Sequence, residues 1–217
     1  MTHHIAHHLT EPLLMAYSAG TLPEAFNLTV AAHISLCDEC RASLEAFDSV
    51  GGALMAECAV SDMAPGSMAA ALAAAKSAQP RQTPAPAKRR NGVLPAPLTD
   101  YVGGDLDAIN WRPVGMGVRQ AVLATSGPAT ARLLHIRAGA VMPDHGHRGT
   151  ELTLVLQGAF LDDGEKFARG DIEVAGEDLH HTPVAGEGED CICLAATDAP
   201  LRFSGWVPRL AQPFLRI

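Results

Sequence analysis

The stretch AHISLCDEC, from Ala32 to Cys40, places one histidine and two cysteines within eight residues. Cys37 and Cys40 have the CxxC spacing, which lets two thiolates bind one tetrahedral ion at the start of a helix. His33 precedes Cys37 by four residues, so both side chains share a face if one helix contains them. Structural zinc sites use four ligands of this kind. The stretch therefore predicts three zinc ligands and requires a fourth from elsewhere in the chain.

The N-terminus offers four histidines for the missing position: His3, His4, His7 and His8. We predict His8, with His7 as the alternative, because His8 stands just ahead of the first expected helix and can fold back on the second. Other interpretations compete with zinc. The cysteines could be a redox-active CxxC pair, or two core thiols beside a buried histidine, and the N-terminal histidines could be the remnant of a purification tag. The histidine four residues before the CxxC pair, together with the spare histidines upstream, favours zinc.

Residues 1–78 read as a small helical domain of about four helices, rich in alanine, with apolar residues at three- and four-residue spacing. Capping residues and stop signals delimit these helices. The expected helices run from a cap at Thr10 to Gly20, from a TxxE capping box at Thr21 and Glu24, from about Cys37 to Glu57, and from Ser67 to Lys76.

A proline-rich stretch, residues 79–97, follows the helical half and predicts an extended linker. From residue 98 to 217 the apolar period changes to two, with glycine, proline and aspartate between the segments. The expected strands are 118–123, 131–136, 151–157, 172–174 and 191–194. The chain is thus predicted to be a multidomain α + β protein, with an antiparallel β-sandwich or barrel after the linker.

The stretch PDHGHRGTE, residues 143–151, predicts a second metal site. His145 and His147 are two apart on a strand, so both imidazoles face the same side. A tight turn then lets Glu151, at the head of the next strand, point into the same pocket. Five residues have the spacing of the first motif of the cupin family, which this segment resembles: Gly139, His145, His147, Glu151 and Gly158.

The resemblance to cupins implies a further ligand on a later strand. It places that ligand directly before Thr-Pro, which selects His181, with His180 as the alternative. Three imidazoles and a carboxylate suit Zn²⁺ or another divalent metal such as Mn, Fe or Ni. Cys191 and Cys193 are expected to lie on a core face of their strand, with oxidation near the pocket as the functional alternative.

Composition excludes several classes of protein. The net charge of −8 argues against a protein that binds nucleic acid directly, and favours a protein partner or a small ligand. No apolar run is long enough for a membrane helix, and the N-terminus lacks the pattern of a secretion signal. Five cysteines without an export signal indicate a reducing cytoplasm, with metal binding or reactive thiols in place of disulfides.

Taken together, the two halves resemble a known family. An upstream histidine followed by HxxxCxxC resembles the zinc-binding anti-sigma domain, and its fusion to a cupin resembles the ChrR family of anti-sigma factors over essentially the whole chain. The segments AYSAGTLPEAFNL, HISLCDECRA, DHGHRG, ELTLVLQGAF, HTPVA and CICLAATDAPLRF carry this resemblance. It implies a cytoplasmic repressor, not an enzyme. Its helical domain would sequester an extracytoplasmic-function (ECF) sigma factor, and its cupin would release that factor in response to singlet oxygen or related oxidants.

On this hypothesis apolar helix faces would bury against sigma, with candidates Leu13, Leu14, Phe26, Leu28 and Val30. The alternative is a metal-dependent cupin dioxygenase or isomerase with an accessory zinc module, because such a centre can activate oxygen or a chelating substrate. The expected pocket strands carry few additional acid–base groups, which favours the regulator.

Overall fold

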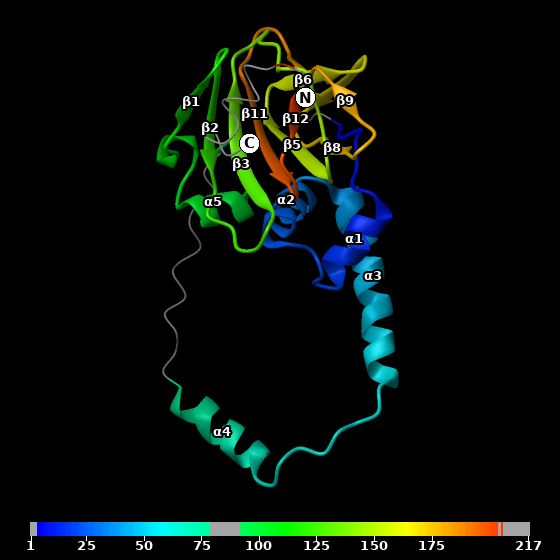
Figure 1. Ribbon diagram of the computed structural model, residues 1–217. Helices are drawn as coiled ribbons and strands as arrows, with labels where there is room; N and C mark the ends of the chain where they lie inside the picture. The colour runs from blue at the N-terminus through cyan, green and yellow to red at the C-terminus, as the bar shows by residue number, and fades with distance from the viewer. Residues whose placement is uncertain (1–3, 79–91, 204, 206–217) are drawn as a thin grey trace.

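The computed structural model describes residues 4–78, 92–203 and 205, and places several helices beneath an antiparallel β-sandwich (Figure 1). The helical part comprises α1 (Glu11–Ser18), α2 (Glu24–Ile34), α3 (Asp38–Glu57) and α4 (Ser67–Ser77). A further helix, α5 (Ala96–Val102), and a 3₁₀ turn (Leu106–Ala108) precede the strands. The predicted helices of the first half are thus present.

Three antiparallel sheets form the cupin. The largest has the order β1 (Arg112–Gly115), β2 (Val118–Val122), β3 (Thr130–Ile136), β11 (Cys191–Thr197), β5 (Glu151–Gln157) and β8 (Ile172–Ala175). The second has the order β10 (Val184–Ala185), β6 (Ala159–Asp162) and β7 (Glu165–Ala168). The third has the order β12 (Arg202–Phe203), β4 (His145–Gly146) and β9 (His180–His181). The predicted fold class, a helical half followed by an antiparallel cupin, is confirmed.

Both faces of the six-stranded sheet are covered. Leu152 and Leu154 of β5 pack in the core shared with the helices, whereas Val155 belongs to the core between the sheets. All seven residues of β11 are buried for the same reason. The alternation of side chains along a strand therefore separates two apolar layers here, instead of an apolar layer from solvent.

The helix α2 lies between the sheet and the other helices, and Phe26, Leu28 and Val30 are buried in one continuous core with strand residues such as Leu133. The helical half and the cupin are therefore packed together. This corrects the expected sigma-binding face. Those three side chains and Leu14 are already buried within this chain, and Leu13 is partly buried against the same core.

Two local expectations also change. Thr21 does not cap α2, because its hydroxyl donates to the carbonyl of Ala16 and the helix starts directly after Pro23. His33 and Cys37 do not share a helix either. Cys37 is the N-cap of α3, and its sulfur accepts a hydrogen bond from the backbone N–H of Cys40 at 3.4 Å.

Most of the predicted linker, residues 79–91, lies outside the described residues. Its last part is folded against the body: the carboxylate of Asp105 accepts hydrogen bonds from the backbone N–H groups of Val93 and Leu94. Leu94 is buried in the shared core, and α5 starts two residues later. The chain therefore rejoins the body ahead of residue 98, where the cupin was predicted to start.

Candidate metal sites and an exposed apolar arm

The predicted ligands of the first site lie together. Ligand atoms of His8, His33, Cys37 and Cys40 all fall within 4.8 Å of one another. The Nδ1 atom of His8 is 3.3 Å from the sulfur of Cys37 and 3.7 Å from that of Cys40. The alternative ligand, His7, points away, with its ring near the carboxylates of Glu165 and Asp171. The four residues can therefore hold a metal ion.

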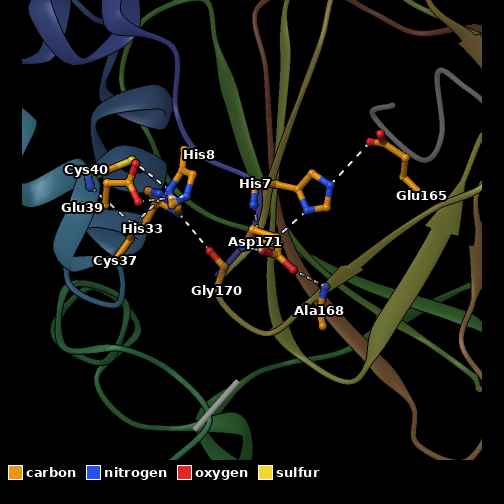
Figure 2. A network of polar contacts seen from close by, with 11 residues as sticks. His7, His8, His33, Cys37, Glu39, Cys40, Glu165, Ala168, Gly170 and Asp171 are labelled. Carbon is orange, nitrogen blue, oxygen red and sulfur yellow. Dashed lines mark hydrogen bonds and ion pairs between the residues drawn. The ribbon is translucent and has the colours of Figure 1, made fainter. Parts of the chain in front are cut away.

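The surroundings orient both imidazoles toward this point (Figure 2). Nδ1 of His33 donates to the carbonyl of Gly170 at 3.0 Å, and Nε2 of His33 is buried with no hydrogen-bond partner among the described residues. Nε2 of His8 lies 3.4 Å from the carboxylate of Glu39. In each ring, one nitrogen is held by a neighbour and the other is left for a metal. This is the usual arrangement around metal-bound histidine.

Electrostatics fit the same role. Burial lowers the pKa of His33 to about 4, so the imidazole stays neutral, which is its metal-binding form. Burial, and then the neighbouring Cys37, raise the pKa of Cys40 to about 11. Without a metal the Cys40 thiol therefore keeps its proton at neutral pH. Metal binding has to displace that proton, and this makes the affinity depend on pH.

Protonation of His33 makes the metal-free protein sensitive to acid. The folded-state pKa lies below that of an unfolded histidine, so the unfolded state binds more protons between about pH 6.5 and pH 4. Stability is fully present above that window and is lost as the pH falls through it. We expect the free energy of unfolding to drop by about 2 kcal/mol between pH 7 and pH 4.5 through this group.

Urea titrations at both pH values, in the presence of a chelator, measure this difference. The variant His33→Gln lacks the titrating ring and serves as the control. An equal drop in the variant would contradict the assignment.

Three predicted ligands of the second site also converge. The Nε2 atoms of His145 and His147 are each 3.1 Å from Nε2 of His181. β4 pairs with β9 so that His145 stands opposite His181, which is buried, whereas His180 faces solvent. The structure thus places His181, and not His180, beside the other two imidazoles.

Neighbours fix which nitrogen of two of these rings is free. Nδ1 of His145 donates to the carbonyl of Pro143 at 2.8 Å, and Nδ1 of His181 donates to Asp162 at 2.7 Å. Both Nε2 atoms are left with lone pairs toward the common point. Burial, and then the adjacent Asp162, raise the pKa of Glu173 to about 9. Glu173 therefore stays protonated at neutral pH, and Asp162 can serve as the charged acceptor.

Asp162 is a residue of the candidate site that the sequence did not reveal. In the sequence it stands between the apolar pair Phe160–Leu161 and Asp163, a pattern that predicts only a turn. Its role depends on a fold that brings β6 next to His181, nineteen positions further along the chain.

The fourth predicted ligand, Glu151, contacts one of the three histidines and does not join the point where their Nε2 atoms converge. Its Oε2 is 3.2 Å from Nδ1 of His147, on the side of the ring away from the three Nε2 atoms. Its Oε1 accepts a hydrogen bond from Thr153. Glu151 is not part of the group whose ligand atoms converge, which consists of the three histidines.

The two cysteines of β11 lie next to each other in the core between the sheets. The sulfurs of Cys191 and Cys193 are 3.4 Å apart and both side chains are buried. The hydrogen bond to Cys191, followed by burial, raises the pKa of Cys193 well above its usual value. A thiol that keeps its proton is a weak nucleophile, so this arrangement favours a packing role over direct oxidation.

A third feature is an exposed apolar segment that extends away from the body (Figure 1). We call residues 50–77, the outer half of α3 through α4, the α3–α4 arm. No residue of α4 is buried, and on α3 only Cys40 and Leu44 are. Seven of the twelve large exposed hydrophobic residues in the described part of the chain belong to the arm: Val50, Leu54, Met55, Val60, Met63, Met68 and Leu72.

Such a concentration of exposed apolar side chains marks a protein-binding or membrane-binding surface. None of the helices in the described residues has the length and hydrophobicity that a membrane span requires. The spacing of Val50 and Leu54, and of Met68 and Leu72, puts each pair on one helical face. The arm therefore presents two short apolar stripes on its exposed surface.

Comparisons with known proteins agree over both halves. Residues 100–200 match a family model described as the ChrR Cupin-like domain. The chain is 58% identical over 213 residues to the anti-sigma-E factor ChrR of Cereibacter sphaeroides, spanning 98% of this chain and 99% of that protein.

One solved structure agrees over most of the chain. The crystal structure of Rhodobacter sphaeroides SigE in complex with the anti-sigma ChrR contains a chain that matches with a TM-score of 0.80 and 54% identity, covering 90% of this chain and 100% of that one. KdgF from Halomonas sp. matches 43% of this chain and 90% of its own, with 26% identity and a TM-score of 0.38.

Proposed function

Since this chain belongs to the ChrR family of anti-sigma factors, we propose that it sequesters an ECF sigma factor and releases it when singlet oxygen or related oxidants act on its cupin half. The observation that carries the proposal is the identity to a ChrR protein over nearly the full length of both chains. It favours a regulator over the dioxygenase or isomerase alternative. A cytoplasmic location, where a sigma factor works, is part of the proposal.

The sigma-binding surface is the α3–α4 arm. The apolar faces of α1 and α2 are buried in the core of this chain, so their side chains are not exposed to a partner. The arm, in contrast, exposes Leu54 and Met68 at 62% and 77% of their surface. Burying such side chains against a partner removes apolar surface from water, which favours association. α3 starts at the first metal site, so the ion orients the helix that carries the arm.

We assign Zn²⁺ to the first site and Zn²⁺ or another divalent metal to the second. Two sulfurs and two imidazole nitrogens form the donor set of structural zinc. The three converging histidines of the cupin suit several metals, and Asp162 holds His181 in the tautomer that binds any of them.

A network of polar contacts joins the first metal site to the cupin (Figure 2). The backbone N–H groups of Ala6 and His7 donate to the buried carboxylate of Asp171 at 2.7 and 3.0 Å. His7 directly precedes the ligand His8, and Gly170, directly before Asp171, accepts the hydrogen bond of the ligand His33. Both imidazole ligands of the first site are therefore tied to the Gly170–Asp171 turn.

The same turn leads into the second site. β8 starts directly after Asp171 and carries Glu173, which interacts with Asp162, the residue that orients His181. A change at the cupin metal can thus shift β8 and its preceding turn, and with it the position of His33. We propose this path as the route by which the cupin alters sigma binding.

The variant Asp171→Ala tests the route. It leaves the backbone donors of Ala6, His7 and Ala168 without their acceptor, so we expect a loss of stability of about 3 kcal/mol in urea unfolding. We also expect it to uncouple the halves. In the wild-type chain, His145→Ala should change sigma affinity several-fold, and in the Asp171→Ala background by less than about twofold.

The matched control is Asp190→Ala, which removes a carboxylate that accepts from the backbone of Ala138 within the cupin. It should leave the effect of His145→Ala on sigma affinity unchanged. An equal effect of His145→Ala in the Asp171→Ala background would refute the route.

The function itself is tested by purifying the chain with its cognate ECF sigma factor. We expect a one-to-one complex in size-exclusion chromatography and inhibition of sigma-dependent transcription in a reconstituted assay. Singlet oxygen, generated by a photosensitiser in light, should restore transcription. Transcription that the chain leaves untouched would end the proposal, and steady turnover of a small molecule would favour the enzyme.

A further inference from the structure

A cavity of about 330 Å³ lies inside the cupin, between the six-stranded sheet and the two smaller sheets. Its volume is at the lower end of the range for small-molecule sites. His145 and His181 reach it from the second metal site. The greater part of its wall is apolar, and includes Val118, Leu134, Ile136, Met142, Phe160 and Phe203.

One permanently charged side chain, Arg132 of β3, lines this cavity. The residue is only 6% exposed, and its Nε and Nη1 atoms have no hydrogen-bond acceptor among the described residues. Glu151, whose charge acts on Arg132, also lines the cavity, and its carboxylate lies 3.2 Å from Nδ1 of His147. A buried guanidinium without acceptors costs several kcal/mol of stability. The described residues thus leave two nitrogens of this guanidinium without a hydrogen-bond acceptor, in spite of the nearby charge of Glu151.

We propose that the cavity binds a monocarboxylic acid with an apolar chain. The carboxylate pairs with the guanidinium of Arg132, and the chain lies along the apolar wall. A carboxylate can accept a charge-assisted hydrogen bond from either unpaired nitrogen of the guanidinium, Nε or Nη1. A wholly apolar ligand would leave those donors unpaired, and a phosphate would bring more negative charge next to Glu151, which also lines the cavity.

The binding of such an acid deepens the proposed function, because an occupied cavity would touch His145 and His181 and act through the Gly170–Asp171 turn. That consequence depends on the proposed function, whereas the binding does not. The decisive measurement is therefore calorimetric titration of the full-length, metal-loaded chain without any sigma factor. Failure of the chain to inhibit sigma would leave its outcome unchanged.

The titration compares three probes: octanoate, octan-1-ol, which lacks the charge, and acetate, which lacks the chain. We expect saturable binding of octanoate, and binding of the other two that is weaker by at least about tenfold. Absence of saturable octanoate binding would overturn the proposal. Equal binding of octan-1-ol would do so as well, because the cavity would then select only for apolar bulk.

Variants of the arginine complete the test. Arg132→Gln should weaken octanoate binding at least about tenfold, and Arg132→Lys, which keeps the charge without the fork, should bind with intermediate affinity. Arg119→Gln removes an exposed arginine from the adjacent strand and should change nothing. Octanoate affinity that is the same in the wild type and in a folded Arg132→Gln or Arg132→Lys variant would refute the role of the guanidinium.

Discussion

Replacing Cys37 with serine is expected to abolish both tight zinc binding at the first site and inhibition of the sigma factor. The sulfur of Cys37 accepts the N-cap hydrogen bond of α3 and lies 3.3 Å from His8, so it both starts the helix and joins the N-terminal segment to it. Structural zinc bound by two thiolates and two imidazoles contributes on the order of 10 kcal/mol in small domains. Loss of one thiolate removes much of that energy and leaves α3 poorly oriented.

Metal content by mass spectrometry and sigma affinity by titration measure the two effects. We expect the cupin to stay folded, because its strands and α2 share an apolar core that does not depend on the ion. Cys58→Ser is the matched control for metal content: it changes an exposed cysteine at the far end of α3, away from the predicted ligands. Cys37→Ser protein that retains one equivalent of tightly bound zinc at this site would contradict the assignment.

The double variant Leu54→Asp, Leu72→Asp is expected to weaken the sigma complex by roughly 100-fold or more, because each change places a charge in an apolar interface. Both side chains are more than half exposed in this chain, so its own thermal stability should change little. The expected combination, lost affinity with an unchanged melting temperature, separates a binding surface from a folding defect.

The control for this variant is Leu161→Asp, the same change at an exposed leucine on the cupin. It should leave sigma affinity within about twofold of the wild type. A sigma complex that forms equally well with the double variant would show that the α3–α4 arm is not the interface.

Local spacing predicted much of the fold. The strands predicted at 151–157 and 191–194 correspond to β5 and β11, because alternation with period two is a property of the strand itself. The helix boundaries near Gly20, Cys37 and Glu57 were similarly visible from caps and stops. The expected capping box at Thr21 does not form, because Pro23 provides the start of α2 and the hydroxyl bonds elsewhere.

The packing of the helical half on the cupin was not visible from the sequence. The sequence showed that Phe26 and Val30 lie on an apolar helix face, but not which surface covers that face. The leucines at 152 and 154, opposite Val155 on the same strand, point to a sheet with two buried faces, which is a signal that pattern analysis can use. The proposed partner-binding surface is therefore the arm, and not the faces of α1 and α2 that carry the expected residues.

The sequence by itself identified candidate metal ligands, the CxxC pair with His33 and the histidines of the cupin motif, because each group lies close together along the chain. The tertiary structure decided how these residues are held. The carbonyl of Gly170 orients His33 from 137 positions away, Asp162 orients His181, and Arg132 of β3 lines the same cavity as His145 and His181. These contacts join elements that are distant in the chain, and no periodicity encodes them. They exist because burying both faces of one sheet brings the elements together.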